Sequence, residues 1–179
     1  MRASLSLALI AVMSLSFGAC SSTSRVASDI YYSLPFTGSK TEAAKPEPPK
    51  EGEQVVKAGA IVFRMQVTPL KVKLSETRHL DVKIRLENTS KKFTQLSFPT
   101  TQRIELLVRS DDGKIITQWS EDRAFDPQPG YVSINPGEFV EYATTLSTRD
   151  LQVGRTYTVL GFFPNYDAFR AEQVITPEP

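Results

Sequence analysis

The chain has very few of the side chains on which most catalytic and metal sites depend. Its 179 residues include one histidine, one cysteine and one tryptophan, which leaves almost no residues for a disulfide framework, a metal cluster or a Cys–His nucleophile pair. The 21 basic and 20 acidic residues leave a net charge of +1, so the chain has no strong field for nucleic acid. No phosphate-binding loop, dinucleotide fingerprint or Gly-x-Ser-x-Gly elbow is present. We therefore expect no cofactor, no metal, no nucleic acid and no small-molecule substrate, and we do not expect an enzyme.

Two groups of residues remain to be weighed as sites of chemistry. His79 stands at the start of an alternating segment, where an exposed strand residue is expected and not a catalytic base. The acidic residues gather at two places, Asp111 with Asp112, and Glu121 with Asp122 and Asp126. Their spacing does not match an EF-hand loop, which favours solvated acidic turns over a calcium site.

The N-terminal segment is typical of an export signal. Residues 1–19 place Arg2 before an uncharged apolar stretch that ends in small residues. This stretch is shorter than the roughly 20 residues that span a hydrocarbon core, which favours a cleaved signal peptide over a membrane helix. We therefore expect residues 1–19 to be a lipoprotein signal peptide.

Cys20, the single cysteine, is the expected lipidation site. The sequence Phe17-Gly18-Ala19-Cys20 resembles the bacterial lipobox, in which the cysteine is acylated and becomes the first mature residue. Fatty acyl chains such as palmitate contribute about 0.8 kcal/mol per buried methylene, so two or more chains hold a protein on a bilayer. The alternative is an ordinary secretory signal with an incidental cysteine. Ser21 and Ser22 follow Cys20, so no aspartate stands directly after the expected lipidation site. By analogy with the lipoproteins of bacteria that have two membranes, this predicts that the protein is anchored in the outer membrane of the cell envelope if the host has two membranes.

Residues 20–58 are expected to be a flexible linker behind the lipidated cysteine. The stretch 45–53 is rich in proline and in charges of alternating sign, a composition that favours an extended, solvated chain. One apolar group, Ile30 to Phe36, interrupts it. This group either docks on the domain or a partner, or acts as an interfacial aromatic anchor.

The rest of the chain shows the period-two alternation of half-buried strands. The clearest case is residues 80–87, where four aliphatic residues alternate with Asp81, Lys83, Arg85 and Glu87. Strands are expected at 61–67, 70–74, 80–86, 93–98, 103–109, 114–119, 131–134, 138–146, 156–163 and 170–175. No helical period is long enough for a crossover connection, which disfavours parallel βαβ units. Residues 59–176 are therefore predicted to form an immunoglobulin-like antiparallel β-sandwich, an all-β domain.

Turn signals separate these strands. Asp-Gly at 112–113 predicts a hairpin, and Asn-Pro-Gly at 135–137 predicts a second reversal. Residues 148–153 are expected to form one helical turn. Tyr157 stands where a tyrosine corner would place it, with its hydroxyl reaching backbone a few residues upstream; the alternative is a tyrosine simply buried in a strand.

In combination, several of these segments resemble the bacterial intracellular proteinase inhibitor family, the BsuPI-like domains. The segments are Leu86-Glu87-Asn88-Thr89-Ser90, Leu96-Ser97-Phe98-Pro99, Asp112-Gly113-Lys114 running into Trp119-Ser120, Phe125, Asn135-Pro136-Gly137-Glu138, and Gly154 with Tyr157. The resemblance covers about residues 60–163 and implies an immunoglobulin-like sandwich whose founding activity is inhibition of a serine proteinase. The founding members act inside the cell, whereas this chain has an export signal, so its target is expected to differ.

The longest predicted connection is the first place to look for a partner-binding loop. Residues 120–130 contain Arg123, Phe125, Pro127 and Pro129, which would present a basic or aromatic residue on a proline-stiffened loop. Residues 99–103 are the second candidate. For both, the alternative is an ordinary sandwich loop, with Phe125 over the core and Trp119 as a core or rim residue. The expected partner is a protein, in the first hypothesis a serine protease, and in the second an envelope protein bound by a structural or assembly module.

Overall fold

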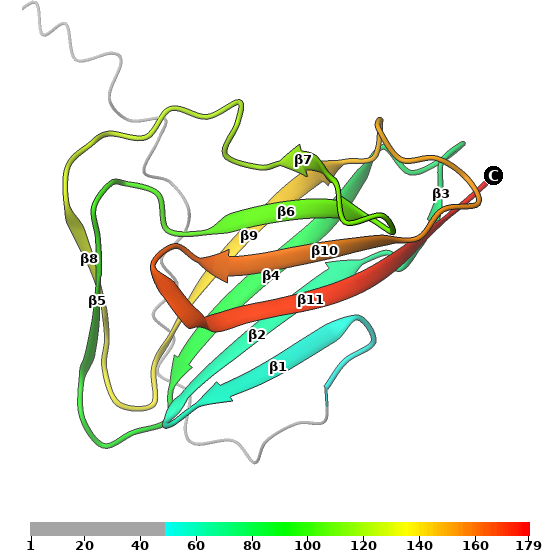
Figure 1. Cartoon of the computed structure of the whole chain (residues 1–179). Helices are drawn as coiled ribbons and strands as arrows, with labels where there is room; N and C mark the ends of the chain where they lie inside the picture. The colour runs from blue at the N-terminus through cyan, green and yellow to red at the C-terminus, as the bar shows by residue number, and fades with distance from the viewer. Residues whose placement is uncertain (1–48) are drawn as a thin grey trace, which may run out of the picture. The chain divides into compact units, whose positions relative to one another are not determined.

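The computed structural model describes residues 49–179, so the predicted signal peptide, Cys20 and the linker up to residue 48 lie outside the described residues. Residues 49–179 form eleven β-strands and no helix, which confirms the all-β prediction (Figure 1). In this part of the chain, no helix is long and apolar enough to cross a membrane.

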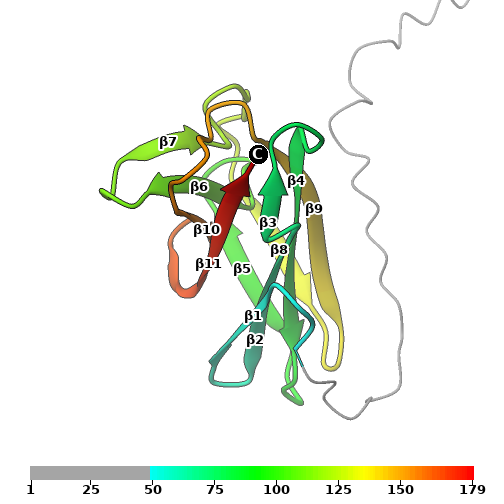
Figure 2. The same cartoon turned by 90° about the vertical axis from the view of Figure 1, so that its right-hand side faces the viewer.

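The strands form two sheets and a separate two-stranded ribbon. The first sheet has the order β1 (Glu53–Ala58), β2 (Ile61–Thr68), β4 (His79–Asn88) and β9 (Phe139–Ser147). The second has the order β3 (Lys71–Lys73), β11 (Tyr166–Glu178), β10 (Tyr157–Phe163), β6 (Glu105–Ser110) and β7 (Ile115–Gln118). The ribbon pairs β5 (Thr94–Phe98) with β8 (Gly130–Ile134), as Figures 1 and 2 show.

The core forms because alternate residues of these strands point inward. On β4, Leu80, Val82, Ile84 and Leu86 are buried, while Asp81 and Lys83 are exposed. The inner faces of both sheets and of the ribbon contribute to one buried cluster, which includes Phe63, Met65, Phe98, Leu106, Val159 and Phe163. This is the two-layer packing predicted from the alternation.

The connectivity is that of an immunoglobulin-like sandwich. Strands β2, β4 and β9 form one layer, while β6, β7, β10 and β11 belong to the other. The chain passes from the first sheet to the second between β2 and β3, at the cis peptide bond Thr68–Pro69. The pairing of β3 with β11 is parallel, which is an exception to the predicted antiparallel arrangement.

Tyr157 forms the predicted tyrosine corner. Its ring is buried, and its hydroxyl oxygen accepts a hydrogen bond of 3.0 Å from the backbone N–H of Gln152. Gly154 supplies the positive φ of 82° that turns the chain between these two residues. The corner therefore fixes the connection from β9 to β10.

The turns follow the sequence signals at two places and depart from them at a third. Gly113 and Gly137 have φ of 83° and 74° in the two predicted reversals. The predicted helical turn at 148–153 is wrong, because the segment is a β-turn closed by Leu151 N–H to Thr148 O at 3.1 Å. Thr148 is instead tied to the chain before β4, since its hydroxyl donates to Thr77 O at 2.7 Å.

The sandwich begins earlier than the sequence predicted. Residues 53–58 lie within the predicted linker but form β1, which pairs with β2 along six residues from Glu53↔Gln66 to Ala58↔Ile61. The pairing is favourable because the Glu53 carboxylate lies 3.6 Å from the Arg64 guanidinium and Val56 packs against the core. At the other end, β11 runs to Glu178, beyond the predicted end of the strand at 175.

Candidate functional site

The connection from β7 to β8 carries the predicted partner-binding residues and packs around Trp119. The Trp119 indole N–H donates to Thr144 Oγ1 on β9 at 2.8 Å. The Arg123 guanidinium carbon lies 4.1 Å from the indole centre, and Arg123 Nε donates to Trp119 O at 3.2 Å. The Phe125 ring centre lies 6.0 Å from that of Trp119. Trp119 is therefore a partly buried rim residue on which Arg123 and Phe125 are held.

Along this connection, exposure differs between the four predicted residues. Arg123, Pro127 and Pro129 are exposed, whereas Phe125 is half-buried. The cation–π contact places one face of the Arg123 guanidinium on the indole, while the Arg123 side chain stays exposed to solvent. The surface that a partner would meet is therefore Arg123 and the two prolines, with Phe125 beneath them as support.

The second candidate loop, residues 99–103, is hydrogen-bonded directly to the first. Thr101 N–H donates to Asp126 O at 3.0 Å, and Asp126 N–H donates to Thr101 Oγ1 at 2.9 Å. Arg103 points inward, where its Nη1 donates to Thr100 O at 2.6 Å. A side chain at Gly130 would collide with the Arg103 guanidinium. We call residues 99–103 and 119–130 together the paired loops.

A buried carboxylate, Glu105, ties the paired loops to the second sheet. Glu105 is 6% exposed. Its Oε1 accepts the backbone N–H groups of Leu106 at 3.0 Å and Ser120 at 3.2 Å. Its Oε2 accepts Gln102 Nε2 at 3.0 Å, Gln118 Nε2 at 3.4 Å and the Ser120 hydroxyl. Because Gln102 and Ser120 belong to different loops, one side chain fixes both.

Sequence reasoning missed Glu105. It stands in a predicted strand, but the alternation gave no sign that a charged residue there would be buried. A buried carboxylate is stable only when it is well hydrogen-bonded, and its donors here lie as far away as Ser120, 15 residues on. The one local signal is the set of polar residues at 102, 105, 118 and 120, which flank β6 and β7.

The other residues considered for chemistry do not form a catalytic arrangement. His79 is exposed at the start of β4, as expected, and pairs with Ser147. Asp112 Oδ1 accepts Lys114 N–H at 3.1 Å and the Ser110 hydroxyl, and the Ser110 bond holds the pKa of Asp112 below its usual value. Within residues 49–179, no three His, Cys, Asp or Glu side chains are arranged to bind a metal ion.

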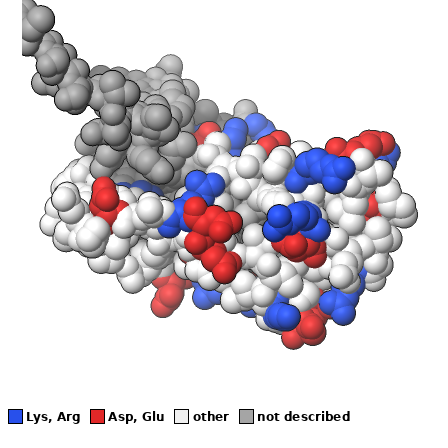
Figure 3. Space-filling model, turned by 90° about the horizontal axis from the view of Figure 1, so that it is seen from above, with Lys and Arg blue, Asp and Glu red and all other residues white. Residues whose placement is uncertain are grey.

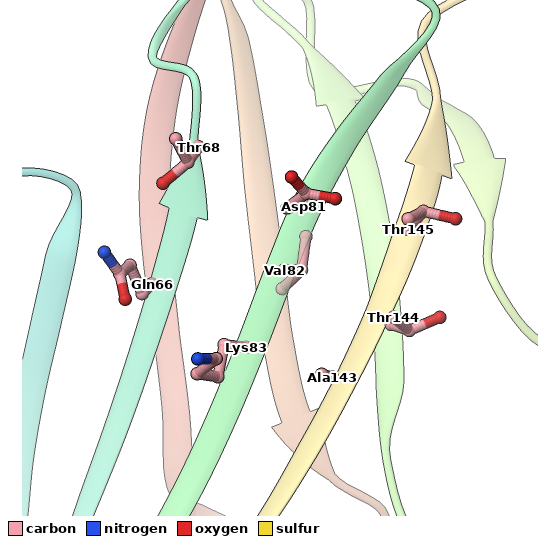
Figure 4. A pocket seen from close by; sticks show the side chains of 8 residues that line it. All are labelled: Gln66, Thr68, Asp81, Val82, Lys83, Ala143, Thr144 and Thr145. Atoms are coloured by element: carbon pink, nitrogen blue, oxygen red, sulfur yellow. The ribbon is translucent and has the colours of Figure 1, made fainter. Parts of the chain in front are cut away.

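One depression is present on the solvent face of the first sheet. It has a volume of about 540 Å³ and is open to solvent (Figure 4). Strands β2, β4 and β9 line it with Gln66, Thr68, Asp81, Val82, Lys83, Ala143, Thr144 and Thr145. Asp81 and Lys83 are its charged side chains, and the lining contains no nucleophile paired with a base.

Charges of both signs lie next to one another on the surface seen in Figure 3. Ion pairs across the sheets of the domain include Arg109 with Glu172 at 2.5 Å and Lys83 with Glu141 at 3.7 Å. Exposed pairs of this kind stabilise little, but they leave no strong field of one sign. The face in Figure 3 is therefore suited to contacts of shape and local polarity.

Taken together, the fold and the paired loops define an immunoglobulin-like β-sandwich with preorganised surface loops. The profile of the BsuPI family, described as intracellular proteinase inhibitor, matches residues 67–166, more than half of the chain. The chain therefore belongs to the BsuPI family of intracellular proteinase inhibitors, which confirms the resemblance seen in the sequence.

Comparison with curated proteins gives no match. Among solved structures, the chain is similar to a β-glucosidase from Erythrobacter marinus, with 16% identity over 66% of this chain and a TM-score of 0.41. The matched part is 15% of that enzyme's length. It is also similar to the C-terminal domain of Wzt (14% identity, 74% of this chain and 83% of that one, TM-score 0.42). A third is the yjhA protein from Bacillus subtilis (12% identity, 70% and 96%, TM-score 0.36).

Proposed function

We propose that this chain is a proteinase inhibitor of the cell envelope that binds a serine protease through the paired loops. The observation that carries the proposal is the membership of residues 67–166 in the proteinase inhibitor family. In this proposal the domain is a binding protein and not an enzyme. The anchoring of Cys20 in a membrane, and the location in the outer membrane of a host with two membranes, belong to the same proposal and rest on the lipobox-like sequence.

The arrangement of the paired loops supports this function physically. A protein that blocks a protease loses less entropy on binding when its contact loops are already ordered. Here Glu105 accepts hydrogen bonds from both loops, and Thr101 pairs with Asp126 between them. Arg123 then offers an exposed guanidinium on a fixed base, a group suited to an acidic pocket of a protease.

A titration against serine proteases of the envelope tests this function. The purified full chain in detergent is titrated into each protease, and residual activity is measured. We expect stoichiometric inhibition of at least one protease. Arg123→Ala should raise the inhibition constant at least tenfold, about 1.4 kcal/mol, because the exposed contact is lost.

The matched control is Arg149→Ala. The Arg149 side chain is 86% exposed in the connection from β9 to β10 and pairs with Asp150. This variant removes an arginine outside the paired loops and should inhibit like the unaltered chain. If no protease in a broad panel is inhibited by the unaltered chain, the proposed inhibition is wrong.

The packing of Phe125 and Arg123 onto Trp119 favours one second candidate, a structural or assembly module that binds an envelope protein without inhibiting it. Side chains engaged within the domain are less available to enter a protease cleft. Crosslinking in membranes followed by purification of the chain separates the two functions. A single dominant partner that is not a protease would support the module, and a protease would support the inhibitor.

A further inference from the structure

Strand β9 lies at the edge of the first sheet and leaves one side of its backbone unpaired (Figure 2). Asn88 N–H donates to Glu138 O at 2.9 Å and Thr148 N–H donates to Arg78 O at 3.1 Å. This register directs the even-numbered residues of β9 toward β4 and the odd-numbered residues away from it. The N–H and C=O groups that point outward belong to residues 139, 141, 143, 145 and 147. None of them has a hydrogen-bond partner within residues 49–179.

The second half of β9 lacks the features that normally prevent edge strands from pairing. Residues 143–147, Ala-Thr-Thr-Leu-Ser, contain no charge and no proline, and their pairing with β4 has no bulge. Four other edge strands in the described part of the chain are protected. Strand β3 has only three residues, two of them lysine. Strand β7 is short and bulged, β8 lies between Pro129 and Pro136, and the Tyr166 hydroxyl occupies the edge of β5 at Ser97.

We propose that β9 pairs with β9 of a second copy of this chain, in an antiparallel ladder centred on Thr144. This register places Ala143 of each copy opposite Thr145 of the other and Glu141 opposite Ser147. It brings outward N–H groups opposite outward C=O groups on both strands and puts no like charges opposite each other. The two first sheets then form one continuous sheet of eight strands across a twofold axis.

Two charged residues that line the depression of Figure 4 support a second copy as the partner of β9. In the depression, Asp81 of β4 lies beside Thr145, and Lys83 lies beside Ala143. In the proposed ladder, Asp81 of one copy and Lys83 of the other stand in the same row, separated only by the short side chains at 145 and 143. The same row occurs twice because of the twofold axis. Residues of opposite charge therefore lie in the same row on the two sides of the junction, at two places.

Sedimentation of the purified full chain in density-matched detergent measures its oligomeric state at protein concentrations between about 1 and 100 µM and so tests the proposal. We expect a dimer. Ala143→Lys places a charge at the junction, and Ala143→Pro removes only an outward N–H, which an edge strand tolerates. Both variants should raise the dimer dissociation constant at least tenfold. The control Ser133→Lys adds the same charge on the exposed face of β8 and should leave the dimer unchanged.

Disulfide trapping tests the register. In a Cys20→Ser background, chains with Ala143→Cys are mixed with chains with Thr145→Cys. Directly opposed residues of a hydrogen-bonded pair have Cα atoms about 5.5 Å apart, which suits a disulfide. The mixed pair should crosslink more than either chain alone. A monomer at 100 µM, a dimer that resists both Ala143 variants, or equal crosslinking in all three samples would each overturn the proposal, even if another protein binds this edge.

Discussion

Replacing Glu105 with glutamine tests whether one buried carboxylate holds the paired loops in place. Oε1 accepts two backbone N–H groups, and Oε2 accepts the amide groups of Gln102 and Gln118. A glutamine has one oxygen and one NH₂ group, so in either orientation two N–H donors face another donor. Each buried donor left without an acceptor costs about 1–3 kcal/mol. We therefore expect Glu105→Gln to lower the free energy of unfolding by about 3 kcal/mol.

Chemical and thermal denaturation measure this change. For a domain of this size, about 3 kcal/mol corresponds to a fall in Tm of about 10 °C. Glu121→Gln is the matched control, because Glu121 is an exposed carboxylate of the same loop, and it should change stability by less than about 0.5 kcal/mol. If Glu105→Gln unfolds with the same free energy as the unaltered chain, Glu105 does not hold the loops.

Hydrogen exchange locates the effect within the domain. In Glu105→Gln, the amides of Ser120 and Asp126 should exchange faster, because the bonds that order the paired loops are weakened. The amide of Gln152, which bonds to the tyrosine corner, should keep its protection. A uniform loss of protection would indicate general destabilisation and contradict a local role for Glu105.

Three further predictions follow from the packing and the turns. Tyr157→Phe leaves the N–H of Gln152 without its acceptor and should cost about 1–2 kcal/mol in denaturant unfolding. Gly161→Val should cost about 1–3 kcal/mol, because the added carbon would lie 2.5 Å from the sulfur of a core methionine; unchanged stability would contradict the tight packing. The pKa of Asp112 is lowered mainly by the Ser110 hydroxyl, so its contribution to stability is present above the usual pKa and is lost as pH falls through the lowered value. An NMR titration should show a lower pKa for Asp112 in the unaltered chain than in the Ser110→Ala variant. Equal pKa values in the two chains would show that the Ser110 hydroxyl is not the cause.

The local pattern of the sequence predicted most of the strands and their turns. Alternation depends only on neighbouring residues, so the buried and exposed positions of β2 and β4 could be assigned before any partner strand was known. The glycines at 113 and 137 indicated chain reversals because glycine, which has no Cβ, adopts positive φ at little cost wherever it stands. The tyrosine corner at Tyr157 could also be predicted, because the N–H group that donates to the Tyr157 hydroxyl belongs to Gln152, only five residues upstream.

Contacts between distant residues decided the rest. Strand β1 was missed because its partner β2 and the Arg64 that pairs with Glu53 stabilise it, while its own charged sequence reads as linker. The parallel pairing of β3 with β11 joins segments about a hundred residues apart, so no local signal encodes it.

For the candidate site, the sequence by itself determined which loops are long, exposed and rich in proline, including Arg123 and Phe125. Only the tertiary structure showed that Trp119 supports these two side chains, that Thr101 joins the two loops at Asp126, and that Glu105 is buried between them. The physical reason is that a buried charge and its donors become neighbours only when the sheets have packed, whereas turn and strand preferences act before any packing.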